Sequence, residues 1–387
     1  MGPTSAGPYR GCENGGIQNG LLTEQASKAD VAPVACKPWA PGGPLLWFPF
    51  WHALLVGSIS SIAQNIWETL TGDGGPRTEV KFERGQGNVN SPTHNVAVTW
   101  TAAAMQGWRS SMEDDHAAVW LPQGDDEVAI FAVLDGHGGW QVSAMARTLL
   151  LRHLRQRLNP PGRAANADLG ASVADAVEAV DAALLKGPLG IGRAFPLAWH
   201  PFSGVGSTLC VAVLDGTKQE IVVSNTGDSR AIVCRSGKAI SLSQDHKPED
   251  EVEYKRIFHA GGAVFRTGPC YRIDGGLNLS RALGDFGYKA NRDLPTSQQK
   301  VVATPDLIVH KWDPEVDEFL LVACDGLFER MSRQEVVDSI RAGLGKGWTS
   351  EEALRHLLLA CCARSAWEPG HDNETAVLVQ WKVSPKY

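Results

Sequence analysis

The sequence lacks the excess of basic residues that nucleic-acid-binding proteins need. It contains 36 Lys and Arg against 43 Asp and Glu, a formal net charge of -7, so we expect no nucleic acid among its partners. None of its eight cysteines forms a C-x-x-C pair, which excludes zinc-ribbon and thioredoxin-like sites. Cysteines within apolar runs behave as small hydrophobic residues. A reducing compartment fits best, and we expect a cytoplasmic protein, with nuclear and membrane-associated locations as alternatives.

A secretory signal and a long apolar run are also missing. No charged segment followed by a short apolar core opens the chain, so we expect no standard signal peptide. Position 6 is Ala6, where myristoylation at Gly2 requires Ser or Thr. The apolar stretch Leu45–Val56 has twelve residues and is interrupted by Pro49 and His52. A spanning helix needs about 20 residues, so this stretch is too short to cross a membrane.

Composition divides the chain into three parts. Residues 1–44 contain eight Gly and six Pro without a period, which is typical of a flexible tail. We interpret residues 45–90 as an apolar and amphipathic segment with a linker, and residues 91–387 as the main domain. The amphipathic stripe consists of Ile59, Ile62, Ile66 and Leu70. It predicts a helix docked on the main domain. Membrane contact through residues 45–70 is the less favoured alternative, because no Lys or Arg lies between residues 38 and 76.

Strand and helix signals alternate from about residue 95 onward. The runs expected to be strands are Val128–Leu134, Thr208–Leu214, Glu220–Ser224, Phe319–Cys324 and Thr375–Trp381. Val173, Val177, Val180 and Leu184 recur at helical spacing. Two capping boxes, Ser332–Glu335 and Thr349–Glu352, each predict the start of a helix.

Acidic residues flank several of these apolar runs. Three runs are followed by acids, at Asp135-Gly136, at Asp228 within Asn225–Arg230, and at Asp325-Gly326; Glu113-Asp114-Asp115 and Asp372 each precede a run. A single Asp-Gly after a strand is normally only a turn. The whole set is better explained if the strand ends share one rim, where clustered carboxylates need a cation. Oxygen ligands suit Mg²⁺ or Mn²⁺ rather than zinc, and two such ions can hold a hydroxide in line with a phosphoester.

Two further residues fit phosphoester chemistry. Arg109 lies four residues before Glu113, and its guanidinium could bind two phosphate oxygens. His137 lies beside the presumed ligand Asp135, where it could protonate a leaving alkoxide.

These motifs together resemble the type 2C, or PPM, family of metal-dependent protein phosphatases. The resemblance runs from about Ala104 to Trp381 and its parts occur in the family's order. They are Met105–Asp114, Phe131–Gly139, Gly206–Thr208, Asn225–Arg230, Asp245–Pro248, Leu279–Asp285, Ala323–Leu327 and His371–Thr375. The resemblance implies an α+β fold in which two antiparallel β-sheets pack as a sandwich flanked by helices. It also makes residues 91–387 the phosphatase catalytic domain.

The resemblance also implies a role for each matching residue. Asp135 bridges two Mn²⁺ or Mg²⁺ ions, Gly136 offers its carbonyl, and Asp325 and Asp372 complete the ligand set. Glu113 and Asp114 orient the attacking water held by the metals, Arg109 holds the substrate phosphate, and His137 is the general acid. Asp228 matches a residue of a weaker third metal site, and Asp285 supports the site.

The sequence departs from the family pattern at two positions near the site. Glu329 stands where most relatives have Asp, so a third ion would be weakened or moved, and we assign Glu329 a supporting role. Phe328 replaces a usual Trp, which we interpret as a packing change.

The expected function is a monomeric phosphatase that acts on phosphoserine and phosphothreonine in phosphorylated proteins. One alternative is a pseudophosphatase that only binds a partner, although Asp135, Asp325 and Asp372 are all retained. The other alternative is a membrane-anchored adaptor that works through residues 1–90.

Overall fold

The computed structural model describes residues 75–90, 94–123, 126–158, 168–187, 192 and 196–385. The expected tail (residues 1–44) and the amphipathic stripe (residues 59–70) lie outside the described residues. Within the described part of the chain, no helix is both long enough and apolar enough to cross a membrane.

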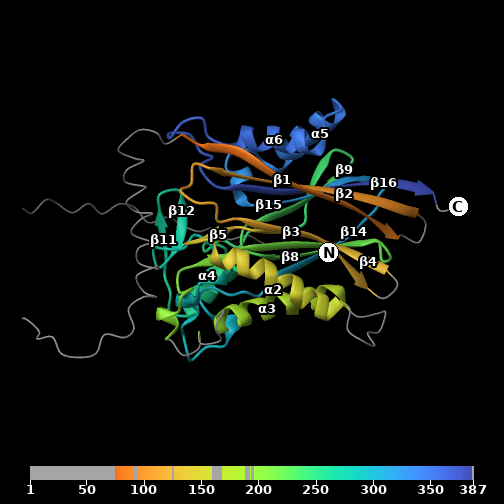
Figure 1. Ribbon diagram of the computed structural model, residues 1–387. Coiled ribbons are helices and arrows are strands. Elements are labelled where there is room, and N and C mark those ends of the chain that lie inside the picture. Colours follow the sequence, from red (N-terminus) through yellow and green to blue (C-terminus); the bar gives the residue numbers. More distant parts are fainter. Residues whose placement is uncertain are drawn as a thin grey trace, which may run out of the picture. The chain divides into compact units, whose positions relative to one another are not determined.

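One large antiparallel sheet combines strands from both ends of the described chain (Figure 1). In spatial order its six strands are β1 (Arg77–Asn90), β2 (His94–Gly107), β16 (Glu374–Pro385), β15 (Asp317–Ala323), β9 (Arg230–Arg235) and β10 (Lys238–Ser241). The last strand in the sequence, β16, is internal and pairs with both β2 and β15.

A second antiparallel sheet has five strands. Their order is β14 (Asp306–Lys311), β8 (Glu220–Thr226), β7 (Leu209–Asp215), β4 (Asp126–Leu134) and β3 (Asp115–Gln123). Alternation along β4 shows how the two layers form. Phe131 and Val133 join the core shared with the six-stranded sheet, whereas Ile130 and Leu134 join the core on the opposite face. Successive side chains of a strand point to opposite faces, so the apolar run Val128–Leu134 of β4 is buried on both faces.

Two pairs of helices cover the outer faces of the sheets (Figure 1). Helices α2 (Gln141–Leu158) and α3 (Leu169–Lys186) bury leucine and valine side chains against the five-stranded sheet. Helices α5 (Arg333–Gly345) and α6 (Ser350–Cys361) pack their apolar faces onto the six-stranded sheet. Both capping boxes predicted from the sequence are present, at the first residues of α5 and α6.

Smaller elements complete the described part of the chain. Short strands β5 (Gly136–His137), β6 (Gly206–Ser207) and β13 (Leu283–Gly284) form a three-stranded sheet. Helix α4 (Glu251–His259) and the hairpin of β11 (Val264–Thr267) and β12 (Cys270–Ile273) share a small separate core. Single-turn helices are η2 (Leu197–Trp199), η3 (Phe286–Lys289), η4 (Thr296–Gln298) and η5 (Asp325–Phe328).

The sandwich of two antiparallel sheets flanked by helices confirms the predicted α+β fold class. The expected boundary at residue 91 falls elsewhere, because β1 lies inside the segment 45–90 that we interpreted as a linker. Residues 77–90 pair with β2 along almost their whole length. They therefore belong to the same sheet as the rest of the domain.

Candidate metal centre

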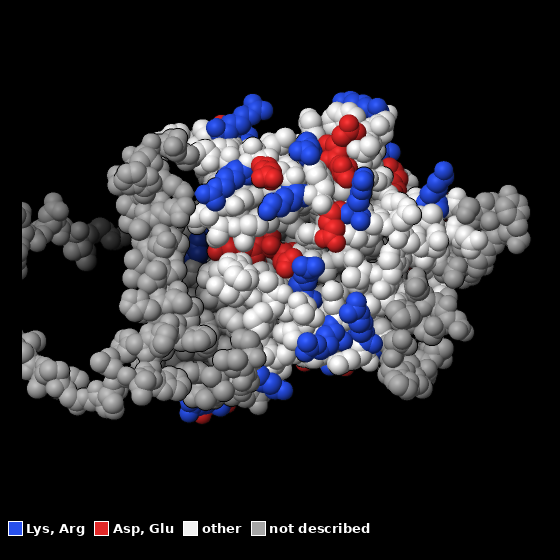
Figure 2. Space-filling model, viewed as in Figure 1, with Lys and Arg blue, Asp and Glu red and all other residues white. Residues whose placement is uncertain are grey.

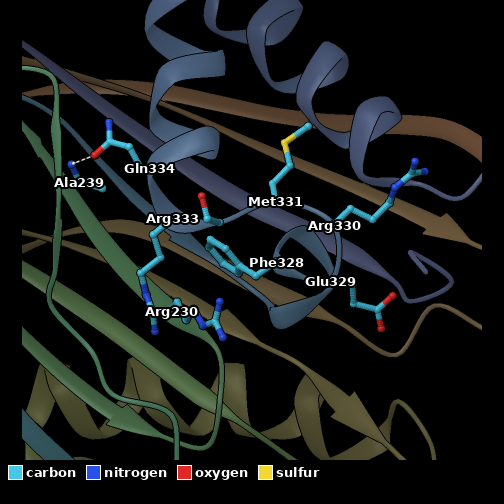
Figure 3. Close-up of a pocket in the computed structure, with 9 residues that line it drawn as sticks. Arg230, Ala239, Phe328, Glu329, Arg330, Met331, Arg333 and Gln334 are labelled. Atoms are coloured by element: carbon cyan, nitrogen blue, oxygen red, sulfur yellow. Dashed lines mark hydrogen bonds between the residues drawn. The ribbon is translucent and has the colours of Figure 1, made fainter. Parts of the chain in front are cut away.

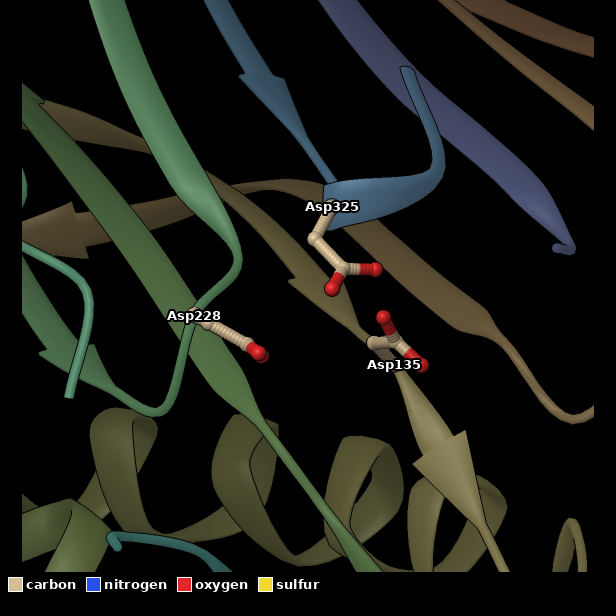
Figure 4. A group of neighbouring side chains, drawn as sticks. All are labelled: Asp135, Asp228 and Asp325. Carbon is tan, nitrogen blue, oxygen red and sulfur yellow. The ribbon is translucent and has the colours of Figure 1, made fainter. Parts of the chain in front are cut away.

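Three aspartates from separate strand ends lie together in the structure (Figure 4). Asp135 follows β4, Asp228 lies in the turn between β8 and β9, and Asp325 begins η5 just after β15. One carboxylate oxygen from each lies within 4.8 Å of those of the other two. The prediction that acids at strand ends share one rim is therefore confirmed for these three residues, and we call them the acidic cluster.

Hydrogen bonds to the neighbouring strands fix the main chain at Asp135. Its N–H donates to Thr208 Oγ1 at 3.0 Å, and its carbonyl accepts from the Thr208 N–H at 2.9 Å. The Thr208 hydroxyl also lies 2.7 Å from Ser229 Oγ, beside Asp228. The next residue, Gly136, passes so close to Glu113 that a Cβ there would lie 2.2 Å from the Glu113 carbonyl oxygen. Close packing therefore requires a glycine directly after Asp135.

Burial and mutual repulsion make the acidic cluster electrostatically unfavourable by itself. Burial raises the pKa of Asp135 and Asp325 well above the usual range, and neighbouring carboxylates raise it further. A divalent cation would offset both the burial of the carboxylates and their mutual repulsion, because its positive charge compensates the negative charges around it. The donors are all oxygens, which Mg²⁺ and Mn²⁺ prefer. The residues present therefore fit the metal that the sequence predicts.

Glu113 and Asp114 are adjacent in sequence but differ in their surroundings. The Glu113 carboxylate accepts hydrogen bonds from Ser111 Oγ (2.8 Å) and from the Gly139 N–H (3.2 Å). Both carboxylate oxygens of Asp114 are buried and accept no hydrogen bond of normal geometry. Burial, together with the charge of Asp372, raises the pKa of Asp114 to about 7. Asp114 therefore has free acceptor capacity facing the site, as a residue that orients water or a metal requires.

Asp372 lies outside the tightest group of acids and faces Arg109. The Arg109 Nη2 atom donates to Asp372 Oδ2 at 2.7 Å. The Arg109 side chain is 58% exposed, whereas that of Asp372 is 18% exposed. The charge of Asp372 nevertheless raises the pKa of Asp114, Asp135 and Asp325. The carboxylates of Asp114, Asp135, Asp325 and Asp372 therefore belong to one electrostatic site, and the positively charged Arg109 side chain lies at its edge.

His137 is paired with a buried carboxylate. Its Nε2 atom lies 2.6 Å from Asp285 Oδ2, and Asp285 is 1% exposed. Burial lowers the pKa of His137, but the charge of Asp285 and its hydrogen bond raise it more, so the net shift is upward. The pairing keeps a proton on the imidazole at higher pH than for a free histidine.

Glu329 holds the main chain that leads to Asp372. Its Oε2 atom accepts from the N–H groups of Gly370 (2.6 Å) and His371 (3.1 Å). Its charge also raises the pKa of Asp325. The longer side chain at this position thus ties the loop before Asp372 to the end of η5.

Two positioning residues were not singled out from the sequence. Lys247 Nζ donates to Asp228 Oδ2 and so compensates that acid from within the protein. Asn373 accepts from the Glu113 N–H and donates to the carbonyls of Gln106 and Ser111, which joins two distant parts of the site. Both residues lie inside the quoted motifs, so their position in those motifs was the available signal.

Comparisons with known proteins agree with this geometry. Residues 99–368 match the family described as Protein phosphatase 2C. The rice (Oryza sativa subsp. japonica) protein named "Probable protein phosphatase 2C 11" is 36% identical over 319 residues, 72% of this chain and 84% of that protein. The Caenorhabditis elegans protein phosphatase ppm-1.G is 45% identical over 202 residues, 52% of this chain and 39% of its own length. The crystal structure of a phosphatase from Toxoplasma gondii superposes with a TM-score of 0.62 at 26% identity, covering 79% of this chain and 100% of that one.

Proposed function

Since this chain belongs to the protein phosphatase 2C family of metal-dependent protein serine/threonine phosphatases, we propose that Asp135, Asp325 and Asp372 hold its catalytic cations. The observation that carries the proposal is the convergence of carboxylate oxygens from Asp135, Asp228 and Asp325, which follow β4, β8 and β15. Gly136 adds a main-chain carbonyl to the set. The retained carboxylates argue against a pseudophosphatase, whose metal ligands are typically lost.

We propose two Mn²⁺ or Mg²⁺ ions as the cofactor, with Asp228 contributing to a weaker third site. When bound, such cations activate water as a nucleophile and compensate the charge that develops on the phosphoryl group. The unpartnered oxygens of Asp114 and the carboxylate of Glu113 would orient that water. Lys247 already neutralises Asp228, which supports a weaker role for Asp228 than for Asp135.

Arg109 is proposed to hold the substrate phosphate. Its guanidinium has further donors beyond the one that contacts Asp372, and a planar fork suits two phosphate oxygens. Its carbonyl accepts from Gln106 Nε2 at 2.8 Å, which fixes the main chain while the side chain stays more than half exposed. The Arg109 guanidinium can therefore contact an incoming phosphoprotein while its main chain stays fixed by Gln106.

His137 is proposed as the general acid. A serine or threonine alkoxide is a poor leaving group, so a proton must reach it as the P–O bond breaks. The imidazolium can supply that proton, and Asp285 keeps it charged and oriented through the 2.6 Å contact.

The substrates are phosphorylated proteins, and we propose that the enzyme acts as a monomer in the cytoplasm. The cysteines of the described residues are free, and most of them are buried. Unpaired cysteines of this kind are typical of a reducing compartment.

The proposal is tested with the purified protein and a phosphothreonine peptide. We expect turnover that requires Mn²⁺ or Mg²⁺, stops in EDTA and returns when either cation is added in excess. Inductively coupled plasma mass spectrometry counts the bound ions, and a phosphatase inhibitor of the okadaic-acid type is the control that should have no effect. Full activity in excess chelator would overturn the metal mechanism.

A further inference from the structure

The domain also has a basic cavity (Figure 3). Its volume is about 590 Å³, and it lies between strands β9 and β10 and the segment that joins η5 to α5. Three of its nine lining residues are arginines, Arg230, Arg330 and Arg333, and one, Glu329, is acidic. The roles proposed above for the metal centre make no use of this cavity.

The cavity is continuous along the chain with the metal centre. Arg230 is two residues after Asp228, and Phe328 belongs to the same short helix as Asp325. Two residues span at most about 7 Å. Burial lowers the pKa of Arg230, but Asp245 raises it more, with contributions from Asp325 and Asp228 of the acidic cluster. The cavity therefore adjoins the metal centre. On the face seen in Figure 2, acidic side chains gather in a band bordered by Lys and Arg.

Two arginines on one side of the cavity share one hydrogen-bonded carboxylate, although Asp325 and Asp228 also act on Arg230. Arg230 forms a two-pronged pair with Asp245, at 3.0 Å through Nε and 2.7 Å through Nη2. Arg333 Nη2 donates to the same carboxylate at 3.2 Å. Two guanidinium groups thus share one carboxylate. Glu329 does not compensate them, because its carboxylate is turned toward the main-chain N–H groups before Asp372.

Arg333 is the arginine with the most unused binding capacity. Its Nε atom is buried and has no hydrogen-bond partner, although its side chain is 35% exposed overall. Burial and the charge of Arg230 both lower its pKa. By contrast, Arg330 on the other side of the cavity donates to the Cys362 carbonyl and pairs with Glu368. An anion entering the cavity would meet the exposed part of the Arg333 guanidinium, because the Nε atom itself is covered by protein.

We propose that this cavity is a subsite for a second anionic group of the protein substrate, located a few residues from the phosphoserine or phosphothreonine that is hydrolysed. Arg333 and Arg230 would provide planar donors, which suit the oxygens of a carboxylate or a phosphate. The ring of Phe328, over which the Arg230 guanidinium lies at 4.5 Å, forms the floor that keeps Arg230 in place. The subsite favours substrates that are acidic or multiply phosphorylated.

The test compares phosphothreonine peptides that differ at one position. A Glu, a Gln or a phosphoserine is placed in turn at each of the four positions on either side of the phosphothreonine, and mass spectrometry identifies which phosphate is removed. The measured quantity is kcat/KM of the acidic peptide divided by kcat/KM of the Gln peptide. We expect a ratio of about ten at one or two neighbouring positions, the effect of one charge-assisted hydrogen bond. The Glu and phosphoserine series show which anion binds better.

Three variants assign the preference to the cavity. Arg333→Gln should bring the ratio close to one, and Arg333→Lys should retain part of it, because a point charge replaces the planar donor. Arg341→Gln is the matched control: Arg341 lies on the same helix but pairs with Glu318 outside the cavity, so the ratio should persist. A ratio near one at every position in the unaltered enzyme overturns the subsite, as does a preference that survives Arg333→Gln. Turnover of the Gln peptide, measured in each protein, separates these results from failure of the phosphatase itself.

Discussion

Two groups of buried acids in this domain are neutralised in very different ways. Around Glu253, every acceptor has a cation or hydroxyl: its Oε2 accepts from Arg256 (2.6 Å) and Ser280 (2.6 Å), and its Oε1 accepts from Arg281 (2.7 Å). Burial raises the pKa of Glu253, but Arg281 and the other partners lower it more, and the net shift is downward. Arg281 also pairs with Asp306, whose pKa falls to about 2 through His246 and Arg281.

The acidic cluster shows the opposite balance. Its carboxylates raise one another's pKa, and the pKa of the nearby Asp114 is also raised, by burial and by the charge of Asp372. The Glu253 group stabilises the fold by internal compensation. In the acidic cluster Lys247 compensates Asp228, whereas Asp135 and Asp325 are the acids that we propose to be compensated by a bound cation. The contrast shows that acids without an internal counter-charge can mark a functional site, whereas acids that are paired within the chain can serve to stabilise the fold.

The largest effect should come from neutralising one acid of the cluster. Asp325→Asn is expected to abolish measurable turnover, because a metal ligand is lost, yet to raise the melting temperature of the chelated protein, because one repelling charge is removed. Activity assays and thermal melts in EDTA check the two outcomes. Asp306→Asn is the matched control in the compensated group and should retain turnover. If Asp325→Asn melts at a lower temperature than the unaltered protein in EDTA, repulsion within the acidic cluster does not destabilise the fold and the contrast with the Glu253 group is wrong.

His137→Ala should cost about 10² to 10⁴ in rate on a phosphothreonine peptide, the range for a lost general acid. The loss should be much smaller with p-nitrophenyl phosphate, because p-nitrophenolate leaves without a proton. Isothermal titration with Mn²⁺ should show that metal binding is retained. An equal loss of rate on both substrates would assign His137 another role.

Glu253→Gln should reduce the free energy of unfolding by about 3–5 kcal/mol, since it leaves Arg256 without its counter-charge and Arg281 with Asp306 alone, in a site where Glu253 is 4% exposed. Urea unfolding followed by tryptophan fluorescence measures the loss. Glu251→Gln, on the first turn of the same helix at an exposed position, is the control and should change stability little. A small loss for Glu253→Gln would mean that the compensated group contributes no more than a surface ion pair.

Replacing Arg109 should affect binding more than folding. Arg109→Ala is expected to raise KM about tenfold, the effect of one charge-assisted contact, and Arg109→Lys should restore only part of the loss. Steady-state kinetics at saturating Mn²⁺ provides the measurement, and an unaltered melting temperature is the control. An unchanged KM would show that Arg109 only pairs with Asp372 and does not hold the substrate phosphate.

The smallest effect should be a trend of stability with pH. Asp114 has a folded-state pKa of about 7, above its usual value near 4. Its contribution to stability is therefore fully present below about pH 4 and is lost as the pH rises through about 7. In EDTA the melting temperature should fall between about pH 5 and about pH 8, and saturating Mg²⁺ should flatten that slope. Asp306, with a pKa of about 2, stabilises the fold above about pH 4 and adds no slope in this range.

Much of the fold could be predicted because its signals are local. The apolar run at Val128–Leu134 is buried on both faces in β4, and the capping boxes at Ser332 and Thr349 begin α5 and α6. Strand β1 was missed because its sequence is polar and contains two glycines. A Cβ at Gly85 would lie 2.7 Å from the Trp100 ring, and one at Gly87 would lie 2.2 Å from the Trp120 ring. Tryptophans from other strands fill the space above these glycines, which no local pattern reveals.

The candidate site could be predicted as a set of residues but not as a set of contacts. The order of acids along the chain identified Asp135, Asp228 and Asp325, which the structure brings together. It did not reveal that Arg109 would pair with Asp372 or that Lys247 would pair with Asp228. These pairings depend on the direction of side chains at the ends of loops. Tertiary packing determines that direction, and the local pattern of the sequence does not reveal it.

The central position of β16 has a consequence for how this protein is made. The strand inserts between β2 and β15, and Asp372 and Asn373 immediately precede it. During synthesis, β2 and β15 leave the ribosome without their shared neighbour, so neither the sheet nor the proposed ligand set is complete until residues 372–385 have emerged. Domains fold largely as units. We therefore expect a chain released short of this strand to be both unstable and inactive.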